Sequence, residues 1–153
     1  MVSRIPTCVL GPALEQKALD QARLRTNLLF WVYLMHWQDR GPTKVGVAND
    51  PHARRNELQT GNPYLLKVYT AFGFQHRDQA FDVEGRVLKR LKARRMTGEW
   101  LDATPLQVRQ IIERGVQQMG LFPTPWESVP PKPTAVETLR AKAAMAEYDR
   151  LRA

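Results

Sequence analysis

Four side chains between residues 33 and 84 have the chemistry needed to hydrolyse a phosphodiester bond: Tyr33, Lys44, Arg54 and Glu84. A phenol, two cations and one acid supply the means to activate water, neutralise a phosphate and bind a metal ion. Each also has a structural alternative. Tyr33 can be a core residue with a satisfied hydroxyl, Lys44 and Arg54 can be solvated charges, and Glu84 can form a salt bridge at the edge of the core.

The spacing of Tyr33 and Lys44 predicts an electrostatic interaction between them. Tyr33 lies in the middle of an apolar segment, and Lys44 opens the next extended segment, two residues before Gly46. If the two segments pair as a hairpin, the ammonium group comes within reach of the phenol. A cation beside a phenol favours the phenolate, so we expect the pKa of Tyr33 to fall below about 10. Gly46 has no side chain and therefore invites close approach of another group.

Basic residues dominate the segment 86–95, which contains no acid. The chain has 23 Lys and Arg against 15 Asp and Glu, a formal net charge of +8. Such density favours salt-sensitive contact with a nucleic-acid phosphate backbone, and a solvated helix face is the alternative. The predicted nucleic-acid-binding residues are Arg55, Arg86, Lys89, Arg90, Lys92, Arg94 and Arg95.

Strands and helices alternate along the part of the chain that carries these residues. The segment 28–36 is apolar on both faces, as expected of a central strand covered by helices on both sides. Asp50 and Pro51 are typical of a helix start, and Thr104 with Pro105 marks another. We expect strands at 28–36, 44–48 and 64–74, helices at 51–60, 79–95 and 104–119, and a short extended piece after Glu99. This order predicts a small fold with mixed α and β layers, followed by a tail.

The length and the prolines predict one domain with appendages. A chain of 153 residues suits a single domain, and five of its 11 prolines lie between Pro123 and Pro133. We expect an N-terminal helical extension at 1–27, a domain at 28–120, a proline-rich linker at 121–133 and a C-terminal helix at 134–153.

Several classes of protein are excluded by composition. The longest apolar run, Leu28–Met35, has eight residues, whereas a membrane-spanning helix needs about 20. The first ten residues contain no sustained apolar region of the kind found in signal peptides. One cysteine, Cys8, forms no internal disulfide and, with three histidines, argues against structural zinc. We expect a cytoplasmic protein without a membrane partner.

Taken together, several short segments resemble the GIY-YIG nuclease superfamily, and most closely its small phage and bacterial branch. The similarity covers residues 28–102, about half the chain. The matching segments are Val32-Tyr33-Leu34, Lys44-Val45-Gly46, Asn49-Asp50-Pro51, Arg54, Leu58-Gln59-Thr60-Gly61-Asn62-Pro63, Glu84 and Gly98-Glu99-Trp100.

The resemblance implies an α+β fold in which a small three-stranded antiparallel sheet is flanked by helices, here with an N-terminal helix and a C-terminal helical tail. It also implies cleavage of DNA with one divalent metal, Mg²⁺ or Mn²⁺. Tyr33 would position or deprotonate water, with help from Lys44, which stands where the superfamily usually has tyrosine. Arg54 would stabilise charge on the phosphate, and Glu84 would bind the metal.

The sequence therefore predicts a metal-dependent DNA endonuclease, with two alternatives. One is a catalytically weak or inactive nucleic-acid-binding module of the same fold, which Leu58 and the missing second tyrosine favour. The other is an adaptor that binds a protein partner through the C-terminal tail. Since a duplex cutter needs two active sites or successive nicks, a homodimer is a further expectation.

Overall fold

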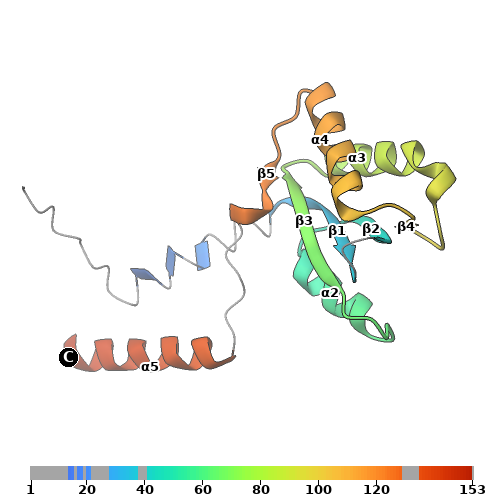
Figure 1. Ribbon diagram of the computed structural model, residues 1–153. Coiled ribbons are helices and arrows are strands. Elements are labelled where there is room, and N and C mark those ends of the chain that lie inside the picture. The colour runs from blue at the N-terminus through green and yellow to red at the C-terminus, as the bar shows by residue number, and fades with distance from the viewer. Residues whose placement is uncertain are drawn as a thin grey trace, which may run out of the picture. The chain divides into compact units, whose positions relative to one another are not determined.

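A computed structural model describes residues 14–15, 17–18, 20–21, 28–37, 41–128 and 135–152, which belong to two compact units. Residues 25–129 form the unit that contains the sheet (Figure 1). The second unit comprises residues 1–24 and 130–153, and it includes helix α5 (Ala135–Arg152), which confirms the predicted C-terminal helix. Of the predicted N-terminal helix, the described residues are helical and the remainder lie outside the described part of the chain.

The sheet has five antiparallel strands in the order β4-β2-β1-β3-β5. Their bounds are β1 Phe30–His36, β2 Thr43–Ala48, β3 Lys67–Phe74, β4 Trp100–Leu101 and β5 Thr124–Pro125. The α+β class is confirmed, but the predicted number of three strands is wrong. The two additional strands have two residues each, which is too short for an alternating pattern to reveal them.

Strand β1 lies at the centre of the sheet and is buried on both faces, as its sequence predicts. Val32 and Leu34 contribute to a core cluster with helices α3 (Arg77–Arg90) and α4 (Pro105–Gln118). Trp31 and Tyr33 contribute to a second cluster, which Leu58 of helix α2 (Pro51–Gln59) joins. Figure 1 shows α2 on the opposite side of the sheet from α3 and α4. The fold therefore has three layers.

Two helices begin at the residues that the sequence predicts. The Asp50 side chain accepts a hydrogen bond of 3.0 Å from the Ala53 backbone nitrogen at the start of α2. Thr104 and Gln107 form a reciprocal capping box at the start of α4. The helix predicted over 79–95, by contrast, ends at Arg90 and continues as the 3₁₀ helix η1 (Lys92–Arg94). The segment 86–95, referred to below as the basic run, is thus divided between α3 and η1.

The first part of the predicted linker belongs to the sheet unit. Strand β5 pairs with β3, and the following 3₁₀ helix η2 (Trp126–Ser128) carries Trp126 into the second core cluster. The Trp126 ring packs edge-on against Trp31, with 5.3 Å between ring centroids. Within the described residues, no helix is long and apolar enough to span a membrane.

Candidate active site

The Tyr33 side chain lies across the neighbouring strand at a position that only glycine allows. Tyr33 pairs with Gly46 in the β1–β2 register, and its side chain is 2% exposed. A Cβ atom on residue 46 would overlap the Tyr33 hydroxyl and the carbon that bears it. The group that approaches Gly46 is therefore the phenol, which reaches across β2 toward its outer edge. Strand β4 pairs with β2 only at Thr43 and Lys44, so it does not extend along that edge as far as Gly46.

Helix α2 brings Arg54 to the Tyr33 hydroxyl. The Arg54 guanidinium is hydrogen-bonded to Tyr33, and it also donates a 2.8 Å hydrogen bond to Glu57. The Arg54 side chain is 43% exposed, so it presents a cation to solvent beside the phenol.

The neighbouring Arg55 points elsewhere, as helical geometry requires. It donates hydrogen bonds to the backbone oxygen of Leu66 (2.8 Å) and to the side chain of Asn56 (3.0 Å). Its contacts therefore hold the segment that follows α2, and its predicted role in nucleic-acid binding stays a prediction.

Lys44 pairs with a carboxylate rather than with the phenol. Its buried ammonium group donates a 2.8 Å hydrogen bond to Glu99, and this ion pair links β2 to the residue before β4. The sequence offered no direct signal for Glu99 as a partner, because 55 residues separate the two along the chain. Glu99 is the site residue that was not predicted from the sequence.

The expectation that Lys44 lowers the pKa of Tyr33 is wrong. Burial raises the pKa of Tyr33 above its ordinary value of 10.0, although the hydrogen bond and positive charge of Arg54 oppose the rise. The negative charges of Glu99 and Glu84 raise it further. Tyr33 is therefore a neutral phenol at neutral pH.

Glu84 reaches this edge from helix α3, on the other face of the sheet. It is 9% exposed, and its carboxylate interacts electrostatically with Tyr33, Lys44 and Glu99. Burial raises the pKa of Glu84, the charge of Glu99 adds to the rise, and Lys44 opposes it. No ion pair of the Glu84 carboxylate is found in the described parts of the chain, so the predicted alternative of a core-edge salt bridge is not observed there.

The donor set at this edge suits a divalent cation that arrives with its substrate. Among the described residues, no group of three or more His, Cys, Asp or Glu side chains forms a complete metal cage. Glu84 offers one carboxylate, while Glu99 is engaged by Lys44. Mg²⁺ is commonly held by one or two carboxylates, with waters and substrate phosphates completing the shell. The residues present fit that mode of binding.

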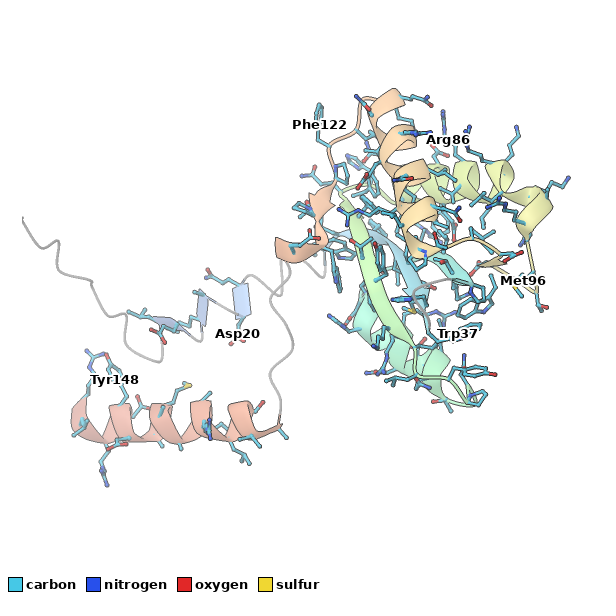
Figure 2. The ribbon with its side chains drawn as sticks, viewed as in Figure 1. Asp20, Trp37, Arg86, Met96, Phe122 and Tyr148 are labelled. Carbon is cyan, nitrogen blue, oxygen red and sulfur yellow. The ribbon has the colours of Figure 1, made fainter. Side chains whose placement is uncertain are left out.

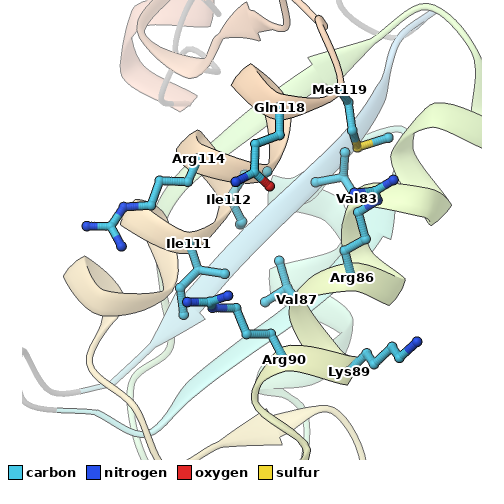
Figure 3. A pocket seen from close by; sticks show the side chains of 11 residues that line it. Val83, Arg86, Val87, Lys89, Arg90, Ile111, Ile112, Arg114, Gln118 and Met119 are labelled. Carbon is cyan, nitrogen blue, oxygen red and sulfur yellow. The ribbon is translucent and has the colours of Figure 1, made fainter.

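Part of the basic run faces away from this site. Because an α-helix turns by about 100° per residue, Arg86 lies about 160° and Arg90 about 120° around α3 from Glu84. Together with Lys89 and Arg114 they line a cavity of about 550 Å³ between α3 and α4 (Figure 3). Its apolar lining residues are Val83, Val87, Ile111, Ile112 and Met119.

The rest of the run lies beside the site. Arg95 forms a backbone bridge with Leu101 of β4, and its side chain donates to the backbone oxygen of Gly98. Lys92 and Arg94 are exposed in η1, immediately before it. Only this second group borders the segment that carries Glu99.

A family model for the T5orf172 domain matches residues 30–116, more than half of the chain. The chain belongs to the T5orf172 domain family. The matching model is not that of a GIY-YIG family, so the superfamily assignment drawn from the sequence is corrected to T5orf172. The T5orf172 match runs from the first residue of β1 into α4 and includes all four candidate catalytic residues. The T5orf172 assignment points to a function related to nucleic acid.

No curated protein and no solved structure shows significant similarity to this T5orf172 chain.

Proposed function

We propose that this T5orf172 protein hydrolyses phosphodiester bonds in DNA with the help of Mg²⁺ or Mn²⁺. The observation that supports this proposal is the convergence of Tyr33, Lys44, Arg54 and Glu84 at one edge of β2. They come from four different elements, so the arrangement is a product of the tertiary fold. The net charge of +8 favours an anionic substrate.

Arg54 and Tyr33 act directly on the reacting groups. The exposed guanidinium of Arg54 neutralises the scissile phosphate, whose charge increases during the reaction. Because its pKa is raised, Tyr33 orients the attacking water through a hydrogen bond of its neutral hydroxyl and does not remove the proton as a phenolate.

Glu84 holds the divalent cation, and Lys44 acts as a positioning residue. When bound, the cation supplies positive charge for the phosphoryl oxygens and lowers the pKa of the attacking water. Lys44 opposes the rise in the pKa of Glu84, so it favours the ionised carboxylate that a cation requires. The ion pair with Glu99 holds the Lys44 ammonium group in place.

The test is nicking of supercoiled plasmid with Mg²⁺ or Mn²⁺, with EDTA as a control. We expect Glu84→Gln to reduce the rate by about 1,000-fold, since several kcal/mol of charge stabilisation are lost. Glu113→Gln is the matched control, because Glu113 lies on α4 in an exposed ion pair with Arg109. Rapid nicking by Glu84→Gln would show that this carboxylate holds no catalytic cation.

A second candidate function is DNA binding without hydrolysis. The protonated state of Tyr33 and the engagement of Lys44 by Glu99 favour it, because neither residue is then a ready general base. This candidate predicts that the folded wild-type protein shifts DNA on a gel in a salt-dependent manner but produces no nicks with either metal.

A further inference from the structure

A second cavity, of about 480 Å³, lies next to the candidate site. Two chain segments that take little part in the proposed hydrolysis contribute most of its lining: residues 58–64, after Arg54, and residues 96–100, before and within β4. Trp37, the residue after β1, completes the lining together with Pro42 and Leu66. In Figure 2 the labelled side chains of Trp37 and Met96 mark its position below and beside the sheet.

Three aromatic rings form a continuous surface in this cavity. The rings of Trp37 and Tyr64 are stacked, with centroids 5.2 Å apart and an interplanar angle of 12°. The rings of Trp100 and Trp37 have centroids 5.0 Å apart and an interplanar angle of 58°. Tyr64 is nevertheless 54% exposed, and Met96 is 52% exposed. This cluster therefore leaves large apolar surfaces accessible to a ligand.

The segment that carries Tyr64 is held rigidly against α2. The Gln59 side chain donates to the backbone oxygens of Asn62 (3.1 Å) and Tyr64 (3.0 Å) and accepts from the Leu66 nitrogen (2.9 Å). Arg55 fixes the Leu66 oxygen from the same helix. A platform that is ordered before binding loses little conformational entropy when a ligand stacks on it.

Two of the residues that line the cavity lie close to residues of the candidate active site. The Lys44 ammonium group lies 6.0 Å from the centre of the Trp100 ring and pairs with Glu99, the residue before Trp100. On the other side, Leu58 lines the cavity one helical turn after Arg54. A strand whose phosphate lies against Arg54 can therefore extend a neighbouring residue into the cavity.

The chemistry of the lining identifies the group that fits. The described residues that line the cavity include aromatic rings, threonines and an asparagine but no charged side chain, although the chain as a whole carries +8. A neutral planar group attached to an anionic chain is a nucleobase. Bases stack on exposed aromatic rings when they are unpaired, whereas in a duplex neighbouring bases already cover both faces.

We propose that this cavity binds an unpaired nucleobase of the substrate strand next to the scissile phosphate. The inference rests on the proposed function, and it names the substrate class as DNA whose base at the cleavage position is unpaired because that part of the strand is single-stranded.

The experiment measures binding in EDTA, so that cleavage plays no part. The probes are a single-stranded oligonucleotide with one central 2-aminopurine and the fully paired duplex of the same sequence, at the same salt concentration. We expect stacking to quench the fluorescence of the single strand, and Tyr64→Leu to weaken its binding by about 10-fold while duplex binding is unchanged. Tyr64→Phe, which keeps the ring, restores wild-type binding.

Phe122→Leu is the matched control, since Phe122 is 97% exposed and does not line this cavity. Equal binding of the single strand by wild type and Tyr64→Leu would overturn the inference, as would an equal loss on both probes or the absence of any binding. Selective loss together with absent plasmid nicking would retain the base pocket and reject the hydrolase. Plasmid nicking without a selective loss of single-strand binding would retain the hydrolase and reject the base pocket.

Discussion

At the scale of single residues, the candidate site contains two acids that burial makes harder to ionise. Tyr33 and Glu84 are both largely removed from solvent, and the pKa of each is raised. For Tyr33 this preserves the neutral state at neutral pH. For Glu84 it means that the ionised carboxylate lowers the stability of the fold, because the charged form is less favourable in the folded chain than in the unfolded one.

We expect Glu84→Gln to raise the melting temperature at neutral pH. Since the folded pKa of Glu84 lies above its ordinary value of 4.5, wild-type stability falls as the pH rises from 4.5 through the folded pKa. Glutamine stays neutral, so the variant melts higher than wild type above that range, and the difference shrinks toward zero below pH 4.5. Thermal melts from pH 4 to pH 8 measure this. A variant that melts lower than wild type at pH 7 would contradict the expectation.

Gly46 is the residue that gives Tyr33 its position. Gly46→Ala places a methyl group against the buried phenol, and we expect a loss of about 1–3 kcal/mol in the free energy of unfolding, together with loss of cleavage. Gly115→Ala is the control, because a Cβ there meets no atom within 4 Å and the residue lies inside α4. It is expected to stabilise the protein by about 0.5–1 kcal/mol. Chemical denaturation and plasmid nicking measure both effects. Cleavage at the wild-type rate by Gly46→Ala would show that the Tyr33 phenol does not need the space left by Gly46.

At the scale of secondary-structure elements, two helices have similar caps but different tasks. Helix α2 begins at Asp50 and carries Arg54, and its last turn anchors the segment with Tyr64. Helix α4 begins at Thr104 and packs on α3, away from the site. The first cap therefore supports both the fold and the site, whereas the second supports the fold.

Asp50→Ala and Thr104→Ala separate these two contributions. Each removes an N-cap, and we expect each to lower the free energy of unfolding by about 1 kcal/mol. Only Asp50→Ala is expected to reduce DNA cleavage at temperatures well below its melting point, because the first turn of α2 positions Arg54. Denaturation curves and nicking rates of the two variants measure these effects. Equal nicking rates would contradict the expectation that the cap of α2 positions Arg54.

At the scale of the whole molecule, the cations of the basic run lie in two different places. Arg86 and Arg90 line the cavity between α3 and α4, whereas Lys92 and Arg94 lie in η1 beside the segment with Glu99. A nucleic-acid strand bound at the candidate site would therefore pass the second pair. Each phosphate contact contributes about 0.7–0.9 to the slope of log K against log salt.

We expect the double substitution Lys92→Gln with Arg94→Gln to lower that slope by about 1.4–1.8, and the double substitution Arg86→Gln with Arg90→Gln to leave it nearly unchanged. Both variants lose the same net charge, so the comparison isolates position from total charge. Titrations with labelled DNA between 50 mM and 200 mM salt measure the slopes. A larger fall in slope for Arg86→Gln with Arg90→Gln than for Lys92→Gln with Arg94→Gln would place the strand over the α3–α4 cavity.

Much of the architecture follows from local sequence patterns. Strands β1, β2 and β3, the starts of α2 and α4, and the burial of β1 on both faces were predicted from alternation, apolar runs and capping residues. These signals are local, because each depends on residues within a few positions of one another. Strand β4 coincides with the short extended piece expected after Glu99, whereas β5 has no such signal, and each pairs with a longer strand beside it.

The electrostatics of the site depended on tertiary structure alone. The sequence identified Tyr33, Lys44, Arg54 and Glu84, but it assigned Lys44 to the phenol and predicted a lowered pKa. In the folded chain Arg54 occupies that place, Lys44 binds Glu99, and burial dominates the pKa of Tyr33. The same is true of the aromatic cavity, in which Trp37, Tyr64 and Trp100 meet from distant segments. Residue types and their local order are written in the sequence, whereas charge partners and solvent exclusion arise only when distant segments pack together.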